Sequence, residues 1–351
     1  MKDIRSWAPY AAAILLAATL AACGGGGDGD QSPRVAYGKL VSFGDSLSDV
    51  GSYRVGAIAQ LGGGEYSING STGVNWTELL AASAHVAAPC AAQTGLQSTI
   101  PSIPAVAVVN HAGCYGYGQG GSRVTDPIGV ANAAFPPPQL GQLTDPVKNQ
   151  ILRHLATSGG TFAADDLVTV LAGGNDVFIN LGAVQQGVTP TQAVTAVATA
   201  GGELGAYVKS LIVANGAKHV VVVNLPDVSQ TPFASALDVP TQGLINTMVQ
   251  QFNAQLAAAV AGTPEVLLVD AYTQGHDQTA RPAAYALTNV TTPACDLTKT
   301  ALPTSLVCTS STLVAGDVSG YAFADTVHPT PFGYSLLARF VAENLIKNGW
   351  L

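Results

Sequence analysis

Four residues in three polar segments have the types and spacing needed for acyl-transfer chemistry. Ser46 stands in FGDSLSD, Asn175 in GGND, and Asp325 and His328 in DTVHP. A serine hydroxyl is a weak nucleophile until a base removes its proton, and that base needs a carboxylate to orient it. Asp325 lies close enough to His328 in sequence to hold one imidazole nitrogen while the other faces Ser46. An amide such as that of Asn175 can donate to a developing oxyanion. We therefore predict a serine nucleophile with a histidine–aspartate base.

The elements that must position these residues follow from hydrophobic patterning. Short apolar runs predict strands over 39–43, 106–110, 166–172, 219–224 and 266–270. Longer patterns predict helices over 75–84, 138–157, 190–214, 241–261 and 331–348. Most apolar runs are continuous, which is typical of parallel strands covered by helices on both faces. The order predicts one α/β domain, a three-layer α/β/α sandwich with a doubly wound, mainly five-stranded parallel sheet.

The polar segments resemble the motif blocks of a known family. FGDSLSD resembles the first block of the GDSL family of the SGNH-hydrolase superfamily, GGND the third and DTVH the fifth. The resemblance covers residues from about 39 to 345 and implies the flavodoxin-like fold of SGNH hydrolases. It implies that Ser46 is the nucleophile and that His328 and Asp325 complete a triad. Asn175 is then the side-chain donor of the oxyanion hole.

The second block of the family is matched less completely. YGQGGS, residues 117–122, stands where the block reads N-x-A-x-G-G-A, and its usual first Asn is not evident. The resemblance implies that the backbone N–H of Gly121 joins that of Ser46 in the oxyanion hole, with Gly120 as the alternative. No G-x-S-x-G sequence occurs in the chain, which disfavours the nucleophile elbow of an α/β-hydrolase.

The resemblance implies a serine ester hydrolase of lipase or esterase type, acting on a small-molecule or lipid ester. It implies no metal and no organic cofactor. Two alternatives stay open: an esterase that removes acetyl groups from polysaccharide, and a non-catalytic surface lipoprotein that keeps the fold. The preferred acyl length depends on the loops at 50–75, 85–135 and 275–320, whose shape cannot be predicted from the sequence.

The first residues have the pattern of an export signal. Lys2 and Arg5 precede an apolar stretch over 11–20, and LAAC then ends at Cys23. This arrangement resembles a bacterial lipobox, so we expect a lipoprotein signal peptide over 1–22 and acylation of Cys23; a plain secretory peptide is the alternative. We expect a flexible Gly-rich tether over 23–38 and the hydrolase domain over 39–351. By resemblance we expect an exported protein anchored by lipid in the bacterial envelope, at the outer membrane or cell surface.

Composition excludes other classes of protein. Of 351 residues, 48% are hydrophobic and 10% are charged, which argues against a mainly disordered chain. The formal net charge of −8 argues against a nucleic-acid partner, which would need a basic surface. Anionic lipid would also repel this charge, so membrane attachment is expected through Cys23 alone. We expect a monomer.

The four remaining cysteines are candidates for disulfides in an exported protein. Each pair lies within one predicted irregular insertion, so we predict the sequence-local pairing of Cys90 with Cys114 and of Cys295 with Cys308. Four unpaired thiols are the alternative. No CxxC or cysteine–histidine spacing suggests a zinc site.

Overall fold

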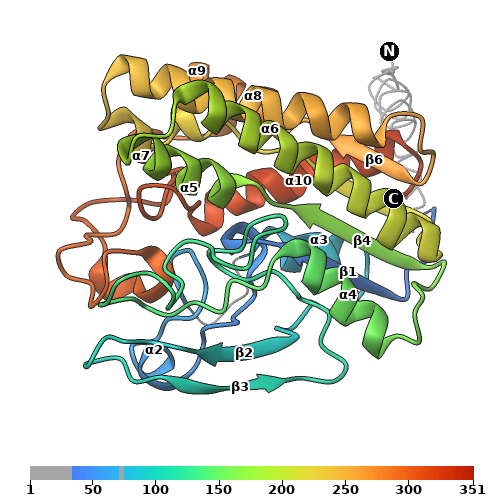
Figure 1. Cartoon of the computed structure of the whole chain (residues 1–351), viewed down its shortest axis with the longest axis horizontal. Coiled ribbons are helices and arrows are strands. Elements are labelled where there is room, and N and C mark those ends of the chain that lie inside the picture. The colour runs from blue at the N-terminus through green and yellow to red at the C-terminus, as the bar shows by residue number, and fades with distance from the viewer. Residues whose placement is uncertain (1–33, 71–74) are drawn as a thin grey trace, which may run out of the picture.

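A computed structural model describes residues 34–70 and 75–351. The expected signal peptide, Cys23 and the first part of the tether lie outside these residues. A parallel sheet forms the centre of the molecule (Figure 1), with strands in the order β1-β4-β5-β6. The strands are β1 (Lys39–Gly44), β4 (Asp166–Leu171), β5 (His219–Val223) and β6 (Val266–Val269).

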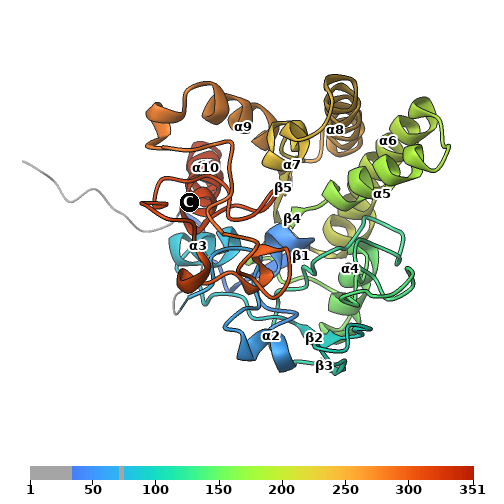
Figure 2. The ribbon, with the colours of Figure 1, turned by 90° about the vertical axis from the view of Figure 1, so that its left-hand side faces the viewer.

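Helices cover both faces of this sheet, as Figure 2 shows along a second direction. The α-helices are α2 (Gly56–Gln60), α3 (Trp76–Ser83), α4 (Val147–Thr157), α5 (Gly174–Gln185), α6 (Pro190–Tyr207), α7 (Pro232–Ser235), α8 (Val239–Val260), α9 (Ala271–Ala280) and α10 (Pro331–Lys347). Short 3-10 segments are η1 (Ser46–Ser48), η3 (Val213–Asn215), η4 (Val228–Gln230), η5 (Pro282–Tyr285), η6 (Ser305–Val307) and η7 (Ser310–Thr312), and η2 (Val208–Ile212) is a π-helix. The mixed α/β architecture with a parallel central sheet confirms the predicted fold class.

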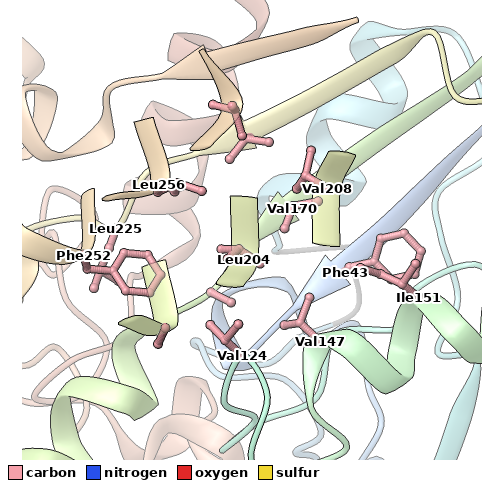
Figure 3. Close-up of a cluster of buried hydrophobic side chains, with 14 of the residues drawn as sticks. Phe43, Val124, Val147, Ile151, Val170, Leu204, Val208, Leu225, Phe252 and Leu256 are labelled. Atoms are coloured by element: carbon pink, nitrogen blue, oxygen red, sulfur yellow. The ribbon is translucent and has the colours of Figure 1, made fainter. Parts of the chain in front are cut away.

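The core lies in two layers because successive side chains of a strand point to opposite faces. Phe43 and Val170 pack against α4, α6 and α8 on one face (Figure 3), and Val222 belongs to the same cluster. Leu40 and Val221 pack against α3 and α10 on the other face. Apolar residues of each strand are therefore buried on both faces, and the carboxyl ends of β1 and β4 are held in register, with Gly44 opposite Leu171.

The prediction of a fifth parallel strand at 106–110 is wrong in its pairing. Val106–Asn110 forms β3, which pairs antiparallel with β2 (Gln93–Leu96) in a separate two-stranded sheet. Most of β3 is exposed, so its apolar, β-branched sequence does not reflect burial in the centre. The position beside β1 is taken by a short segment instead: Ser42 N–H donates to Tyr115 O at 2.9 Å, and Tyr117 N–H donates to Ser42 O at 2.7 Å.

The helices differ from the prediction in one boundary and in number. The helix expected over 138–157 begins only at Val147, because Pro146 occupies its N-cap position with an extended backbone. The sequence pattern does not predict α2, α5, α7 or α9. The other four predicted strands and the helices at 75–84, 241–261 and 331–348 occur at those places, with small shifts of their ends. The helix predicted over 190–214 is α-helical only to Tyr207 and continues as the π-helix η2 and the 3-10 segment η3.

Two disulfides cross-link loops outside the central sheet. Cys90 is bonded to Cys114 and Cys295 to Cys308, which is the sequence-local pairing. In the described part of the chain, no helix combines the length and the apolar character needed to cross a bilayer.

Candidate active site

The turn after β1 presents Ser46. Gly44 is required there, since a Cβ at this position would lie 2.2 Å from Leu171 O of the neighbouring strand. Asp45 then caps η1, and its Oδ1 accepts the N–H of Leu47 at 3.0 Å. Ser46 is the first residue of this turn and lines a large cleft, with 9% of its surface exposed.

Ser46, His328 and Asp325 form a continuous hydrogen-bonded chain. His328 Nε2 lies 2.8 Å from Ser46 Oγ, and His328 Nδ1 lies 2.8 Å from Asp325 Oδ2 and 2.9 Å from Oδ1. The carboxylate only accepts hydrogen bonds, so Nδ1 carries a proton and the lone pair of Nε2 faces the serine hydroxyl. Burial acts to raise the pKa of Asp325, but the charge of His328 and several hydrogen bonds outweigh it and hold this pKa well below its usual range. Asp325 is therefore ionised wherever the imidazole works as a base.

The imidazole is also held by packing. The ring of Tyr66 lies against His328, with 4.7 Å between the ring centroids, and the Tyr66 hydroxyl is hydrogen-bonded to the side-chain amide of Gln142. Asp325 Oδ1 accepts the N–H groups of Val327 and His328 at 2.9 and 2.8 Å. These contacts fix the histidine loop around its own carboxylate.

The opposite wall of the site carries the predicted oxyanion donors. Asn175 lies in the first turn of α5 and donates one amide hydrogen to Ser122 O at 2.9 Å. Gly121 lines the cleft with φ of +82°, and a Cβ there would lie 2.3 Å from Val130 O. The N–H of Gly120 donates to Asp49 Oδ2 at 2.9 Å. Gly120 therefore already has a partner, whereas Gly121 faces the cleft.

Buried carboxylates hold the loops of the site. Burial raises the pKa of Asp45 to about 7 and that of Asp49 to about 6, against the effect of the N–H groups that they accept. Asp49 accepts from Gly51 and Ser52 as well as from Gly120. The turn that bears Ser46 and the loop that bears Gly121 are thus tied together by one side chain.

The cleft has a volume of about 920 Å³ and predominantly apolar walls. Aromatic and aliphatic side chains that line it include Phe178, Ile179, Leu181, Leu225, Phe233 and Leu336. Phe178 and Phe233 pack edge to face, with centroids 5.2 Å apart. Among residues 34–70 and 75–351, no group of three or more His, Cys, Asp and Glu side chains is arranged to hold a metal ion.

The structure brings the predicted site residues together in one place. Ser46, Gly121, Asn175 and His328 all line the cleft, and Asp325 lies behind His328. Sequence reasoning missed Tyr66 and the backbone N–H of Ser305, which donates to Asp325. Neither has a local sequence signature, because loops distant in sequence bring them to the site.

Comparisons with known proteins identify one family. Residues 40–341 match the family described as GDSL-like Lipase/Acylhydrolase. No curated protein matches the chain. The crystal structure of a lipase/acylhydrolase from Enterococcus faecalis is similar at 15% identity with a TM-score of 0.35, over 88% of this chain and 94% of that one. The family match spans most of the sequence, so the chain belongs to the GDSL-like lipase/acylhydrolase family, which supports a hydrolase of ester substrates.

Proposed function

We propose that the protein is a carboxylic-ester hydrolase that works through an acyl-enzyme on Ser46. The observation that carries this proposal is the hydrogen-bonded chain from Asp325 through His328 to Ser46 Oγ. The chain ends in a cleft that also contains Asn175 and Gly121. A nucleophile, a base and donors for negative charge thus surround one space where an ester carbonyl can be bound.

The first half of the reaction transfers the acyl group to the enzyme. Ser46 Oγ attacks the carbonyl carbon while its proton passes to His328 Nε2, and the carbonyl oxygen becomes an oxyanion. The N–H groups of Ser46 and Gly121 and the amide of Asn175 donate to this oxyanion. The engagement of the Gly120 N–H with Asp49 supports Gly121 as the donor. The carbon–oxygen bond to the alcohol then breaks, and His328 gives its proton to the departing oxygen.

The second half returns the enzyme to its starting state. Water attacks the acyl carbon while His328 Nε2 takes a proton from it, and the oxyanion forms again between the same donors. Collapse breaks the bond to Ser46 Oγ, which recovers its proton from His328, and the carboxylic acid leaves. Asp325 stays ionised and stabilises the imidazolium in both halves, consistent with its low pKa.

We propose further that the acyl group is apolar and extends along α5. The cleft is lined by one face of this helix, formed by Gly174, Asn175, Phe178, Ile179, Leu181, Gly182 and Gln185. Asn175 marks the end near the carbonyl, and Gly182 lies about 10 Å farther along the helix axis at roughly 1.5 Å per residue. An acyl chain bound by Asn175 at its carbonyl would pass over Phe178 toward Gly182.

The polysaccharide alternative receives no specific support from this site. A sugar chain needs many hydrogen-bonding groups, whereas the walls here are mainly aliphatic and aromatic. The complete set of nucleophile, base and donors also argues against a non-catalytic lipoprotein. We propose in addition that acylation of Cys23 holds the domain at the bacterial envelope, which the LAAC sequence supports.

The test is ester hydrolysis by the full chain, measured with p-nitrophenyl esters from acetate to palmitate and with acetylated polysaccharide. We expect activity on acyl esters that Ser46→Ala abolishes, together with labelling of Ser46 by a serine-reactive phosphonate. Activity that survives Ser46→Ala would refute the mechanism. Acetate release from polysaccharide with inert acyl esters would favour the alternative substrate, and failure to label would favour the non-catalytic alternative.

A further inference from the structure

The carboxylate of Asp325 is bound from outside its own turn by one group in the described part of the chain. Four of its contacts come from the N–H groups of Val327 and His328 and from the His328 ring. The remaining one is the backbone N–H of Ser305, 2.7 Å from Oδ2. The turn as a whole is also anchored by the N–H of Phe233, which donates to Thr326 O at 2.8 Å. Ser305 is the contact that another segment makes with the carboxylate itself.

Ser305 is itself held in a buried segment. It is the first residue of η6, and Asn69 clamps this segment: its Nδ2 donates to Ser305 O at 3.1 Å and to Cys308 O at 3.1 Å, and its own N–H donates to Cys308 O at 2.8 Å. Ser305 and Cys308 have no exposed surface. The position of the Ser305 N–H thus depends on where residues 305–308 are anchored.

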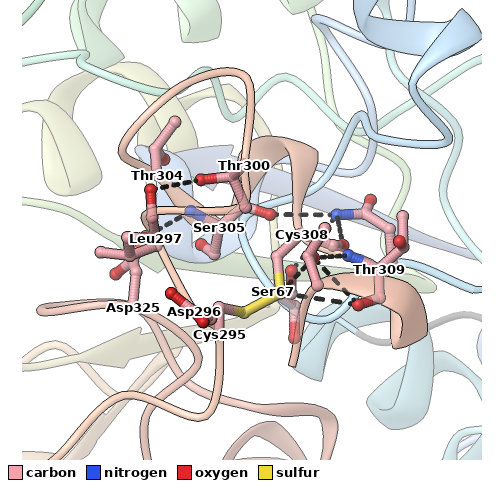
Figure 4. Close-up of a disulfide and its surroundings, with 12 residues drawn as sticks. Ser67, Cys295, Asp296, Leu297, Thr300, Thr304, Ser305, Cys308, Thr309 and Asp325 are labelled. Carbon is pink, nitrogen blue, oxygen red and sulfur yellow. Dashed lines mark hydrogen bonds between the residues drawn. A yellow bond between two sulfur atoms is a disulfide. The ribbon is translucent and has the colours of Figure 1, made fainter. Parts of the chain in front are cut away.

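The Cys295–Cys308 disulfide joins that segment to the chain beside the catalytic turn. Cys295 N–H donates to Ala324 O at 2.9 Å, immediately before Asp325. Ala324 is fully buried and packs in a small cluster with both cysteines. Figure 4 shows the disulfide, Ser305 and Asp325 in one cluster. The cross-link therefore connects the two segments that contact Asp325, one through Ala324 and the other through Ser305.

We propose that the Cys295–Cys308 disulfide and the Ser305 N–H form a positioning element for the carboxylate of Asp325. Its role is to hold the carboxylate where it orients His328 toward Ser46, rather than to stabilise the fold in general. This inference rests on the proposed function, because it assigns a role within the same triad. The Cys90–Cys114 disulfide provides the contrast, since Cys90 is exposed, whereas Cys295 and Cys308 are buried in a cluster with Ala324.

The first experiment compares Cys295→Ser/Cys308→Ser with Cys90→Ser/Cys114→Ser in the full chain. Cys295 and Cys308 are 13 residues apart, and Cys90 and Cys114 are 24 residues apart. Because a disulfide that closes a longer loop stabilises the folded state more, loss of Cys90–Cys114 should have the larger effect on the free energy of unfolding. We expect the first double variant to lose about 10- to 100-fold in kcat with KM nearly unchanged, as for a catalytic group displaced by a fraction of an ångström to about 1 Å. We expect the second to keep its kcat. Equal kcat losses, or none in either variant, would overturn the proposal.

A second pair of variants tests the backbone N–H of Ser305 alone. This pair tests the proposal even if Cys295→Ser/Cys308→Ser does not fold. Ser305→Pro removes the donor at the first position of η6, where proline is compatible with a helical turn; the extended backbone of Thr304 also suits a following proline. Ser310→Pro makes the same change at the exposed first position of η7. We expect Ser305→Pro to lower kcat and to displace the acid limb of the pH–rate profile. We expect Ser310→Pro to change neither.

The outcomes separate this inference from the proposed function. If Ser46→Ala abolishes hydrolysis but Ser305→Pro keeps the wild-type kcat and pH profile, the positioning role is wrong and the triad stands. If hydrolysis survives Ser46→Ala, the proposed function fails, and the positioning role fails with it. Ser305→Ala retains the N–H, so recovery of most of the kcat relative to Ser305→Pro supports the backbone group as the contact that matters.

Discussion

The proposed path of the acyl chain along α5 predicts the effect of filling that path. Gly182 lies in the middle of α5 and lines the cleft, and a Cβ built there meets no atom within 4 Å. A Cβ at this position therefore displaces no neighbouring atom, and we expect the ring of Gly182→Phe to enter the cleft that Gly182 lines. Because glycine is a poor helix former, the change also improves helix propensity by about 0.5 kcal/mol. We expect a folded protein with a shortened acyl site.

The size of the effect follows from the apolar contact that is lost. If the ring displaces about four methylene groups of a long chain, at roughly 0.8 kcal/mol each, binding in the transition state weakens by about 3 kcal/mol. This corresponds to a loss of about 100-fold in kcat/KM for long-chain esters. Esters of acetate and butyrate end before they reach Gly182, so their kcat/KM stays at the level of the unchanged protein. The ratio between long and short esters is therefore the quantity to measure.

The assay is a series of p-nitrophenyl esters of increasing acyl length, with kcat/KM determined for each. Gly243→Phe is the matched control, because Gly243 lies within α8, is exposed, and also has room for a side chain, with no atom within 4 Å of where its Cβ would stand, yet it does not line the cleft. We expect this control to keep the original chain-length profile. A Gly182→Phe protein with an unaltered profile would refute the path along α5, since the ring would then occupy space that no substrate uses.

Three further predictions concern the oxyanion donor, a buried carboxylate and the anchor. Asn175→Ala should lower kcat by about 10²–10³, measured with a short ester, because one oxyanion donor is removed; an unchanged kcat would exclude that role. The free energy of unfolding of Asp45→Asn minus that of the original protein should rise by up to about 4 kcal/mol as pH rises from about 4 to 8, measured by denaturant unfolding. The sign follows because the folded protein, with a pKa of about 7, holds a proton that the unfolded chain has lost; a stability difference that stays constant with pH would contradict it. Cys23→Ser should abolish incorporation of a labelled fatty acid and release the protein from membranes; labelling that persists would contradict the lipobox.

Sequence alone predicted that Ser46, His328 and Asp325 lie together because each of them lies in a short local pattern. Asp325 and His328 are on one turn, and Ser46 lies two residues after a strand whose apolar residues are buried on both faces. Four strands of the sheet were predicted for the same reason. A strand that is covered on both sides has a continuous apolar sequence. This pattern can be recognised in the sequence without knowing which strands lie beside it.

The features that escaped prediction depend on contacts between distant segments. The run at 106–110 is as apolar and β-branched as the central strands, so only its tertiary pairing distinguishes an exposed hairpin from a fifth core strand. Helix α9 buries little more than Ala271 and has a mainly polar sequence, so no periodic pattern marked it. The N–H of Ser305 belongs to the backbone, which carries no residue-type signal at all.

The buried carboxylates explain why so polar a site can be rigid. Loops cannot align backbone N–H groups toward a cleft by apolar packing alone, because each buried N–H needs an acceptor. Asp45 accepts from the nucleophile turn, Asp49 joins that turn to Gly120, and Asp176 accepts the N–H of Val124 at 3.1 Å. Burial raises the pKa of Asp49 and of Asp176 to about 6, so keeping them ionised above that pH costs folding free energy. The folding free energy that Asp49 and Asp176 cost should therefore grow as pH rises from about 4, near the ordinary pKa of aspartate, to about 6, and stay constant above that.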